Sequence, residues 1–205
     1  MDPEDNRRGW AERSEDFSPR YYAEIGANEV SETLAAVFEH YVPEDAAVLE
    51  LGCSSGRHLA HLRERGYENL TGIDINDESF EVMAEYFPEL AETGTFHTGS
   101  IEELLPEFDD DAFDVIYSVE TLQHVHPDDE WVFDEIVRVT ADLLVTAENE
   151  GNGPTRGRAD DPVSYVNDEF PLYHRDWKDV FSQIGLAQLL REPSKRDTVR
   201  VFRAV

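Results

Sequence analysis

The amino-acid sequence predicts an α/β fold, a three-layer sandwich in which a mostly parallel β-sheet is covered by helices on both faces. Short apolar runs that end at glycine or polar residues alternate with longer segments whose apolar residues recur every three or four positions. Strands that alternate with helices in this way pair in parallel, because each helix carries the chain back to the starting edge of the sheet. The 205 residues, 40% of them hydrophobic, suit one domain with a single sizeable core.

The predicted elements follow one another in a regular order. A helix is predicted over residues 28–41, where Leu34 and Phe38 fall on one face, and Pro43 ends it. Apolar runs predict strands at residues 46–51, 70–75, 95–97, 113–119 and 143–147. Helical spacing predicts helices at residues 57–65, 78–87, 101–105, 128–139 and 176–184. Two last strands form a hairpin that places one strand antiparallel to the others, at residues 186–190 and 198–202.

Two segments depart from this alternation. Residues 1–19 are charged, and we predict that they form a flexible acidic N-terminal arm, with room for a short helix in it, before a single domain at residues 20–205. Residues 148–174 contain a glycine-rich, turn-forming run that starts at Glu150. Because the pattern of helix and strand resumes afterwards, we expect this stretch to be an irregular part of the same domain and not a linker.

The composition is strongly acidic. The 46 Asp and Glu residues against 17 Lys and Arg give a formal charge of −29. Nucleic-acid binding needs basic residues to neutralise phosphates, and an acidic surface disfavours anionic membranes, so neither partner is expected. Only two of the 17 basic residues are lysine, Lys178 and Lys195. Abundant acid with so little lysine resembles proteins of halophilic archaea, where strong salt shortens the screening length to about 3 Å at 1 M.

Cysteine usage and the lack of long apolar runs indicate where the protein is found. Cys53 is the sole cysteine, so no intrachain disulfide can form. The first residues lack the apolar core of a signal peptide, and no run approaches the roughly 18 apolar residues of a membrane span. We therefore expect a cytoplasmic protein, and we expect no metal site.

The strand at residues 46–51 runs into a glycine-bearing turn suited to a cofactor. Glu50 stands two residues before Gly52, and Gly56 follows four residues after it. In open α/β sheets ligands bind at the carboxyl ends of strands, and glycine lets the backbone approach them closely. Dinucleotide-binding enzymes require a third glycine that this turn lacks. Asp74 lies about twenty residues further on, and its carboxylate can accept hydrogen bonds from both hydroxyls of a ribose. It therefore supports a cofactor that contains a nucleoside but does not distinguish a dinucleotide from another one.

The turn, Asp74 and the segment 113–125 together resemble the class I S-adenosylmethionine-dependent methyltransferases. The run from Glu50 to Gly56 is similar to their E/D-x-G-x-G-x-G loop, with Ser54 in place of the middle glycine. The resemblance covers roughly residues 46–147. It implies a seven-stranded sheet of order 3-2-1-4-5-7-6, S-adenosylmethionine as the cofactor and S-adenosylhomocysteine as the product. The predicted final hairpin fits that order.

The resemblance also implies which residues hold the cofactor. Glu50 is expected to position its amino-acid end and Asp74 its ribose. All the residues expected at the cofactor are Glu50, Gly52, Cys53, Ser54, Gly56, Asp74, Ile75, Asn76, Ser100, Ile101, Ser118 and Val119. Two of them have a structural alternative: Asn76 can cap the following helix, and Ser100 can form a capping box with Glu103.

No catalytic residue is assigned, because methyl transfer mainly requires alignment, and a general base is obligatory only for weakly acidic nucleophiles. The candidates are His124, Tyr22 and His174. For His124 the alternative is a buried, hydrogen-bonded anchor. Substrate contacts are expected from segments outside the shared core, with candidates Tyr21, Tyr22, Arg156, Arg158 and Tyr173. The two arginines have the alternative of surface ion pairs, and the paired tyrosines that of ordinary packing in an N-terminal segment.

The sequence therefore predicts transfer of a methyl group from S-adenosylmethionine to an unidentified acceptor, with a small molecule as the first choice and a protein as the second. The alternative is a non-catalytic S-adenosylmethionine-binding protein of the same fold with a regulatory or interaction role. An NAD-dependent oxidoreductase is disfavoured by the missing third glycine. We expect a monomer or a homodimer.

Overall fold

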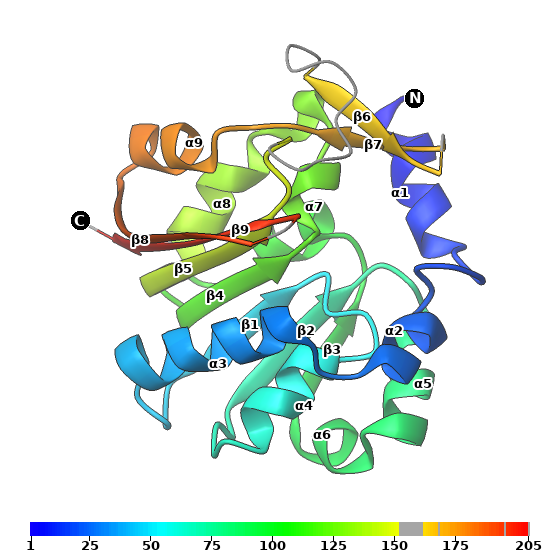
Figure 1. Cartoon of the computed structure of the whole chain (residues 1–205), viewed down its shortest axis with the longest axis vertical. Helices are drawn as coiled ribbons and strands as arrows, with labels where there is room; N and C mark the ends of the chain where they lie inside the picture. The colour runs from blue at the N-terminus through cyan, green and yellow to red at the C-terminus, as the bar shows by residue number, and fades with distance from the viewer. Residues whose placement is uncertain (152–161, 168, 195, 205) are drawn as a thin grey trace.

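The computed structural model of the chain describes residues 1–151, 162–167, 169–194 and 196–204. Its centre is a seven-stranded sheet with the order β3-β2-β1-β4-β5-β9-β8 (Figure 1). Strands β1 to β5 pair in parallel, whereas β9 is antiparallel to both β5 and β8. The strands of this sheet are β1 (Val48–Leu51), β2 (Leu70–Asp74), β3 (Thr95–Thr98), β4 (Phe113–Val119), β5 (Thr140–Glu148), β8 (Leu186–Pro193) and β9 (Thr198–Ala204).

Helices cover both faces of the sheet and bury a separate core on each (Figure 1). One face carries α3 (Glu29–Tyr41), α4 (Arg57–Arg63), α5 (Ser79–Tyr86) and α6 (Pro88–Thr93). The other carries α7 (Ile101–Leu104), α8 (Val132–Val139) and α9 (Trp177–Gln183). Neighbouring strand residues alternate between the two cores, as Val48 and Leu49 of β1 do. None of the described helices is long and apolar enough to cross a membrane.

The predicted α/β class, its three layers and the final hairpin are confirmed. The strand labels differ from the order 3-2-1-4-5-7-6 because β6 (Val163–Val166) and β7 (Phe170–Tyr173) form a separate two-stranded sheet. With these two strands set aside, β9 and β8 take the seventh and sixth places. The hairpin of β6 and β7 lies within the stretch predicted to be irregular, where four-residue strands give too short an alternation to be recognised.

Two helices on the faces of the sheet also differ from the prediction. Helix α8 begins at Val132 and not near residue 128, because Pro127 opens a separate 3₁₀ turn (Pro127–Asp129). Helix α6 was not predicted. It follows α5 directly and begins at Pro88, since proline at a first helical position lacks only a hydrogen bond that would be missing there anyway.

The N-terminal residues do not extend away from the domain. They include helix α1 (Pro3–Ala11), capped by Asp2, and lead into α2 (Pro19–Ile25), capped by Ser18. Asn6 of α1 is only 4% exposed, and its Nδ2 donates to the backbone oxygen of His124 at 2.7 Å. The segment predicted as a flexible arm thus contains a short helix, as the prediction allowed, but this helix is packed against the domain. The division into an arm and a domain at residue 20 stays a prediction.

Candidate functional site

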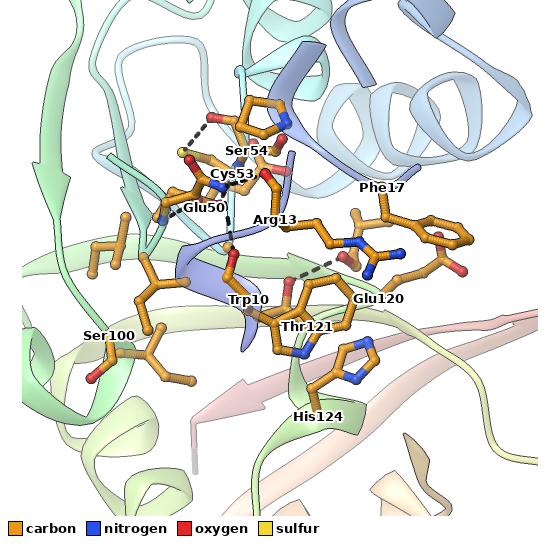
Figure 2. Close-up of a pocket in the computed structure, with 18 of the residues that line it drawn as sticks. Trp10, Arg13, Phe17, Glu50, Cys53, Ser54, Ser100, Glu120, Thr121 and His124 are labelled. Atoms are coloured by element: carbon orange, nitrogen blue, oxygen red, sulfur yellow. Dashed lines mark hydrogen bonds between the residues drawn. The ribbon is translucent and has the colours of Figure 1, made fainter. Parts of the chain in front are cut away.

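A pocket lies at the carboxyl ends of β1, β2 and β4, where the turns that follow these strands come together (Figure 2). It opens to solvent and is lined mainly by apolar surface with a few polar groups among it, as ligand pockets usually are. Ten of the twelve residues predicted for the cofactor line it: Glu50, Gly52, Cys53, Ser54, Asp74, Ile75, Asn76, Ser100, Ile101 and Val119.

The turn after β1 has a left-handed backbone at three positions. Gly52 has φ 67°, and a Cβ there would lie 2.3 Å from Oγ1 of Thr121, so a side chain does not fit. Ser54, in the position of the middle glycine, has φ 50°, and its N–H donates to Oδ2 of Asp74 at 2.7 Å. This hydrogen bond offsets part of the strain of a non-glycine residue in that conformation. Gly56 (φ 80°) is the N-cap of α4 and does not line the pocket.

Asp74 joins the turn after β1 to the segment after β2. Its Oδ2 accepts from Ser54, and its Oδ1 accepts the N–H of Asn76 at 2.9 Å and the hydroxyl of Ser79 at 2.8 Å. Burial raises the pKa of this carboxyl, and the three hydrogen bonds oppose the rise. A carboxylate offers about four acceptor positions, so about one remains for a ligand hydroxyl. The carboxylate predicted to bind ribose is therefore also a structural link.

Glu50 is a buried carboxyl in the pocket. It is only 1% exposed, and the hydroxyl of Tyr117 donates to its Oε2 at 2.9 Å. Burial raises its pKa well above the ordinary value, while the bond from Tyr117 and the nearby Arg57 oppose the rise. A single neutral donor leaves most of its acceptor positions open, so Glu50 is suited to receive a cationic ligand group.

Ser100 has the capping role given as its alternative, whereas Asn76 forms a turn just before α5, whose N-cap is Glu78. Oγ of Ser100 accepts the N–H of Glu103, whose carboxylate accepts the N–H of Ser100, and this capping box begins α7. Oδ1 of Asn76 accepts the N–H of Glu78, and its Nδ2 donates to the backbone oxygen of Arg13 at 2.9 Å. Both residues still line the pocket, so capping and ligand contact are compatible.

The sequence prediction missed the N-terminal wall of the pocket. Trp10, Arg13 and Phe17 line it and reach across from the N-terminal segment (Figure 2). The ring of Trp10 lies 4.4 Å from that of His124, and the guanidinium of Arg13 lies 4.8 Å from the ring of Phe170. The available signal was the aspartate and proline that begin α1, a typical helix start, followed by a tryptophan.

The loop after β4 is held by Glu148 at the end of β5, a residue that the sequence prediction also missed. Glu148 is fully buried. Its Oε1 accepts the hydroxyl of Ser118 at 2.8 Å and the N–H groups of Thr121 and Leu122 at 3.3 and 3.1 Å, and its Oε2 accepts the N–H of Gln123 at 3.2 Å. Burial raises the pKa of Glu148 to about 8 against these bonds. Ser118 thus supports the loop, and its side chain does not line the pocket.

His124 lines the pocket as a neutral imidazole. Its Nδ1 lies 3.0 Å from the backbone oxygen of Pro171, and since a carbonyl can only accept, Nδ1 carries the hydrogen. Burial lowers the pKa of His124 to about 4. The structure supports the anchoring role given as the alternative for this residue. It also leaves Nε2 as the unprotonated nitrogen of the ring.

The remaining predicted residues are divided between the pocket and its surroundings. Tyr22 lines the pocket, whereas its neighbour Tyr21 does not. The ring of Tyr21 packs on that of Phe17, with the two ring centroids 5.5 Å apart. Tyr173 and His174 do not line it either. Arg156 and Arg158 lie outside the described residues. Within the described part of the chain, no group of three or more His, Cys, Asp or Glu residues is arranged to hold a metal ion.

Residues 48–142 match the family model described as a methyltransferase domain. This range contains β1 to β4, their turns and most of the pocket. Among curated proteins, EEF1A lysine methyltransferase 2 of Mus musculus is 30% identical over 60 residues, which are 29% of this chain and 25% of that protein. The match thus spans about a quarter of the curated relative's length.

Solved structures show the same fold at low identity. The PH0226 protein of Pyrococcus horikoshii has a TM-score of 0.71 at 18% identity, over 90% of this chain and 95% of that chain. The 1,6-didemethyltoxoflavin-N1-methyltransferase of Burkholderia thailandensis, solved with S-adenosylhomocysteine, has 0.67 at 17%, over 86% and 79%. Magnesium protoporphyrin IX methyltransferase of Synechocystis, solved with S-adenosylmethionine, has 0.63 at 15%, over 97% and 89%. With the family match, these complexes support S-adenosylmethionine as the cofactor.

Proposed function

We propose that this protein is an S-adenosylmethionine-dependent methyltransferase that acts on a small-molecule acceptor. The observation that carries the proposal is the pocket itself. It brings Glu50, Asp74 and the capped start of α7 at Ser100 together at the carboxyl ends of adjacent parallel strands, within the range matched by the methyltransferase family. This edge of an α/β sheet is where such folds bind their ligands.

The residues of the pocket fit the parts of the cofactor. Glu50 is suited to accept the ammonium of its amino-acid end, and Asp74 has an acceptor position for a ribose hydroxyl. Ile75 and Ile101 offer apolar contact for the adenine, and Val119 lies at the other end of the lining, beside the loop after β4. The cofactor supplies a methyl group on a positively charged sulfur. The protein's contribution is to align that group with the acceptor and to exclude water.

The wall near the loop after β4 is the proposed place for the acceptor. Trp10, Phe17 and Tyr22 line it together with His124 and Glu120. Three aromatic side chains in one wall favour a small, partly planar molecule over a protein segment. His124 is neutral at pH 7, and we propose that Nε2 orients the acceptor or takes a proton that it releases.

The test is binding followed by turnover. Thermal shift in molar KCl is expected to show a higher melting temperature with S-adenosylmethionine and with S-adenosylhomocysteine, whereas NAD has no effect. Incubation of a metabolite extract with cofactor labelled in its methyl group should then transfer label to small molecules. Stabilisation by NAD alone refutes the cofactor. Binding without turnover on any extract favours the non-catalytic alternative, and label in the protein fraction favours a protein substrate.

The proposal also includes the setting of the enzyme. The charge of −29 with only two lysines leads us to propose a salt-adapted protein of a halophilic archaeon that acts in the cytoplasm as a monomer or homodimer. Sedimentation in molar KCl decides between the two oligomeric states.

A further inference from the structure

Hydrogen-bond acceptors that lack donors gather at the end of the pocket proposed for the methyl acceptor. Glu120 and His124 both belong to the loop after β4 and line the pocket (Figure 2). Oε1 of Glu120 is buried and accepts no aligned hydrogen bond from the described residues, although Nη2 of Arg196 lies 2.9 Å from it. Nε2 of His124 is the unprotonated ring nitrogen, because Nδ1 donates to the backbone oxygen of Pro171. A carboxylate and an imidazole nitrogen at this end therefore call for a ligand that donates hydrogen bonds.

A second carboxylate interacts with Glu120. Asp197 directly precedes β9 and is only 6% exposed, and its Oδ1 has no hydrogen-bond partner in the part of the chain that the structure describes. Burial and then the charge of Glu120 raise the pKa of Asp197, while Arg196 opposes the rise. The Arg196 side chain is half exposed, so water weakens its effect. Two acids against one such arginine leave an excess of negative charge at this end of the pocket.

The arginines of the pocket lining have contacts of their own. Among the described residues, three arginines line the pocket. Two of them pair with acids outside it, Arg7 with Asp129 at 2.6 Å and Arg13 with Glu169 at 3.1 Å. The third, Arg57, begins α4 on the side proposed for the cofactor. The excess of negative charge at Glu120 therefore remains for a ligand to balance.

Aromatic side chains complete this end of the pocket. Trp10, Phe17 and Tyr22 line it, and the charge of Glu120 adds to burial in raising the pKa of the Tyr22 phenol, so the two side chains are neighbours. The guanidinium of Arg57 stacks on the Tyr22 ring at 4.7 Å, so this wall already accommodates a cation. Aromatic rings beside a carboxylate suit a cationic amine. The indole N–H of Trp10, also without a partner among the described residues, suits a neutral oxygen or nitrogen elsewhere on the same ligand.

We propose that the methyl acceptor is an amine, bound as its ammonium by the carboxylate of Glu120 and by Nε2 of His124, with Asp197 as a positioning residue that acts through Glu120. This assignment rests on the proposed function and names its class of substrate. The backbone of Glu120 is suited to the role. It has a left-handed φ of 51°, and its N–H donates to the backbone oxygen of Ala147 at 2.9 Å. A side chain on a backbone held in this way has a fixed direction, and such strain is found at binding and catalytic sites.

The proposed binding mode also accounts for the proton. An ammonium has no lone pair, so one N–H proton first passes to the carboxylate of Glu120. The nitrogen then forms the new N–C bond with its lone pair while the C–S bond breaks, and the electrons of that bond stay on sulfur, which becomes the neutral thioether of S-adenosylhomocysteine. The product is a methylated ammonium. The proton on Glu120 passes to water when the product leaves.

The test uses three aromatic probes of different charge with the protein saturated with S-adenosylhomocysteine. Benzylamine is a cation at neutral pH, benzyl alcohol is its uncharged counterpart and benzoate is an anion. Calorimetry in KCl of fixed molar concentration is expected to show that benzylamine binds about tenfold more tightly than benzyl alcohol, as a hydrogen bond to a charged group would give, and that benzoate binds most weakly.

The variants locate the charge that causes this preference. Glu120→Gln should abolish the preference for benzylamine over benzyl alcohol and leave the affinity for S-adenosylhomocysteine unchanged. Asp197→Asn should reduce the same preference to a smaller extent. Glu89→Gln removes one negative charge from an exposed helix position and should change neither quantity.

Two results in the binding test overturn the assignment. One is equal or absent binding of benzylamine, or tighter binding of benzoate, in the unmodified protein. The other is a preference for benzylamine that survives Glu120→Gln. If Glu120→Gln does not fold, the three probes still decide with the unmodified protein.

Turnover gives an independent result. A metabolite extract is first separated by cation exchange, and label from the methyl group of the cofactor is expected in products of the cationic fraction. Label confined to the neutral or anionic fractions overturns the assignment. Failure of the unmodified protein to bind S-adenosylhomocysteine, or no label in any fraction, refutes the proposed function instead.

Discussion

A substitution of Glu148 tests how the loop after β4 is held in place. The perturbation is Glu148→Gln, which keeps the size of the side chain but removes its titration. Burial raises the pKa of Glu148 from 4.5 to about 8 in the folded protein. Between these values the folded state holds one more proton than the unfolded state, so stability falls as pH rises, by about 1.4 kcal/mol per unit. Over the interval 8 − 4.5 the loss is on the order of 5 kcal/mol.

The assay is urea unfolding of the wild type and of Glu148→Gln at a series of pH values from 5 to 9, in KCl of constant molar concentration. All other titrating groups are shared by the two proteins and cancel in the difference. The free energy of unfolding of the wild type is expected to fall relative to that of Glu148→Gln up to about pH 8 and to level off above it. Glu89→Gln, a substitution on an exposed helix position, should show no such trend.

The opposite trend refutes this reasoning. If the wild type gains stability relative to Glu148→Gln as pH rises, then the donors Ser118, Leu122 and Gln123 stabilise an ionised carboxylate by more than burial penalises it. The loop would then depend on a buried anion at neutral pH. Either result measures the electrostatic environment beside the pocket, because Thr121 of the same loop lines it.

Three further predictions concern the pocket and the surface. Asp74→Ala is expected to weaken S-adenosylhomocysteine binding by about 1–3 kcal/mol in calorimetry and to lower the melting temperature, because Ser54 and Ser79 lose their acceptor; unchanged affinity would show that the ribose lies elsewhere. Gly52→Ala should destabilise by about 1–3 kcal/mol in urea unfolding, since its Cβ would meet Thr121, whereas Ser54→Gly should be neutral or stabilising; equal effects would contradict the strain argument. In dilute buffer the helical circular dichroism should decrease and return in molar KCl, and an identical spectrum in both would count against salt adaptation.

The sheet and the helices on its faces could be predicted because their signals are local. The strand β1 is a short apolar run that ends at Gly52, and α3 carries its apolar residues at helical spacing behind the cap of Asn28. The helix α1 has a local start signal in Asp2 and Pro3, but its packing against the domain could not be predicted. Its stability in the fold depends on partners more than a hundred residues away, such as the His124 carbonyl that Asn6 binds and the Phe170 ring beside Trp10.

The same distinction divides the candidate site. The half proposed for the cofactor is made by residues at or near the ends of strands, so the positions of Glu50, Asp74 and Ser100 could be predicted from the element ends, and all three line one pocket. The half proposed for the acceptor is made by contacts between the N-terminal segment and the loop after β4, which no spacing in the sequence reveals. A single sequence can therefore indicate which class of cofactor such a pocket binds. The acceptor must be inferred from the pocket residues that only tertiary contacts bring together.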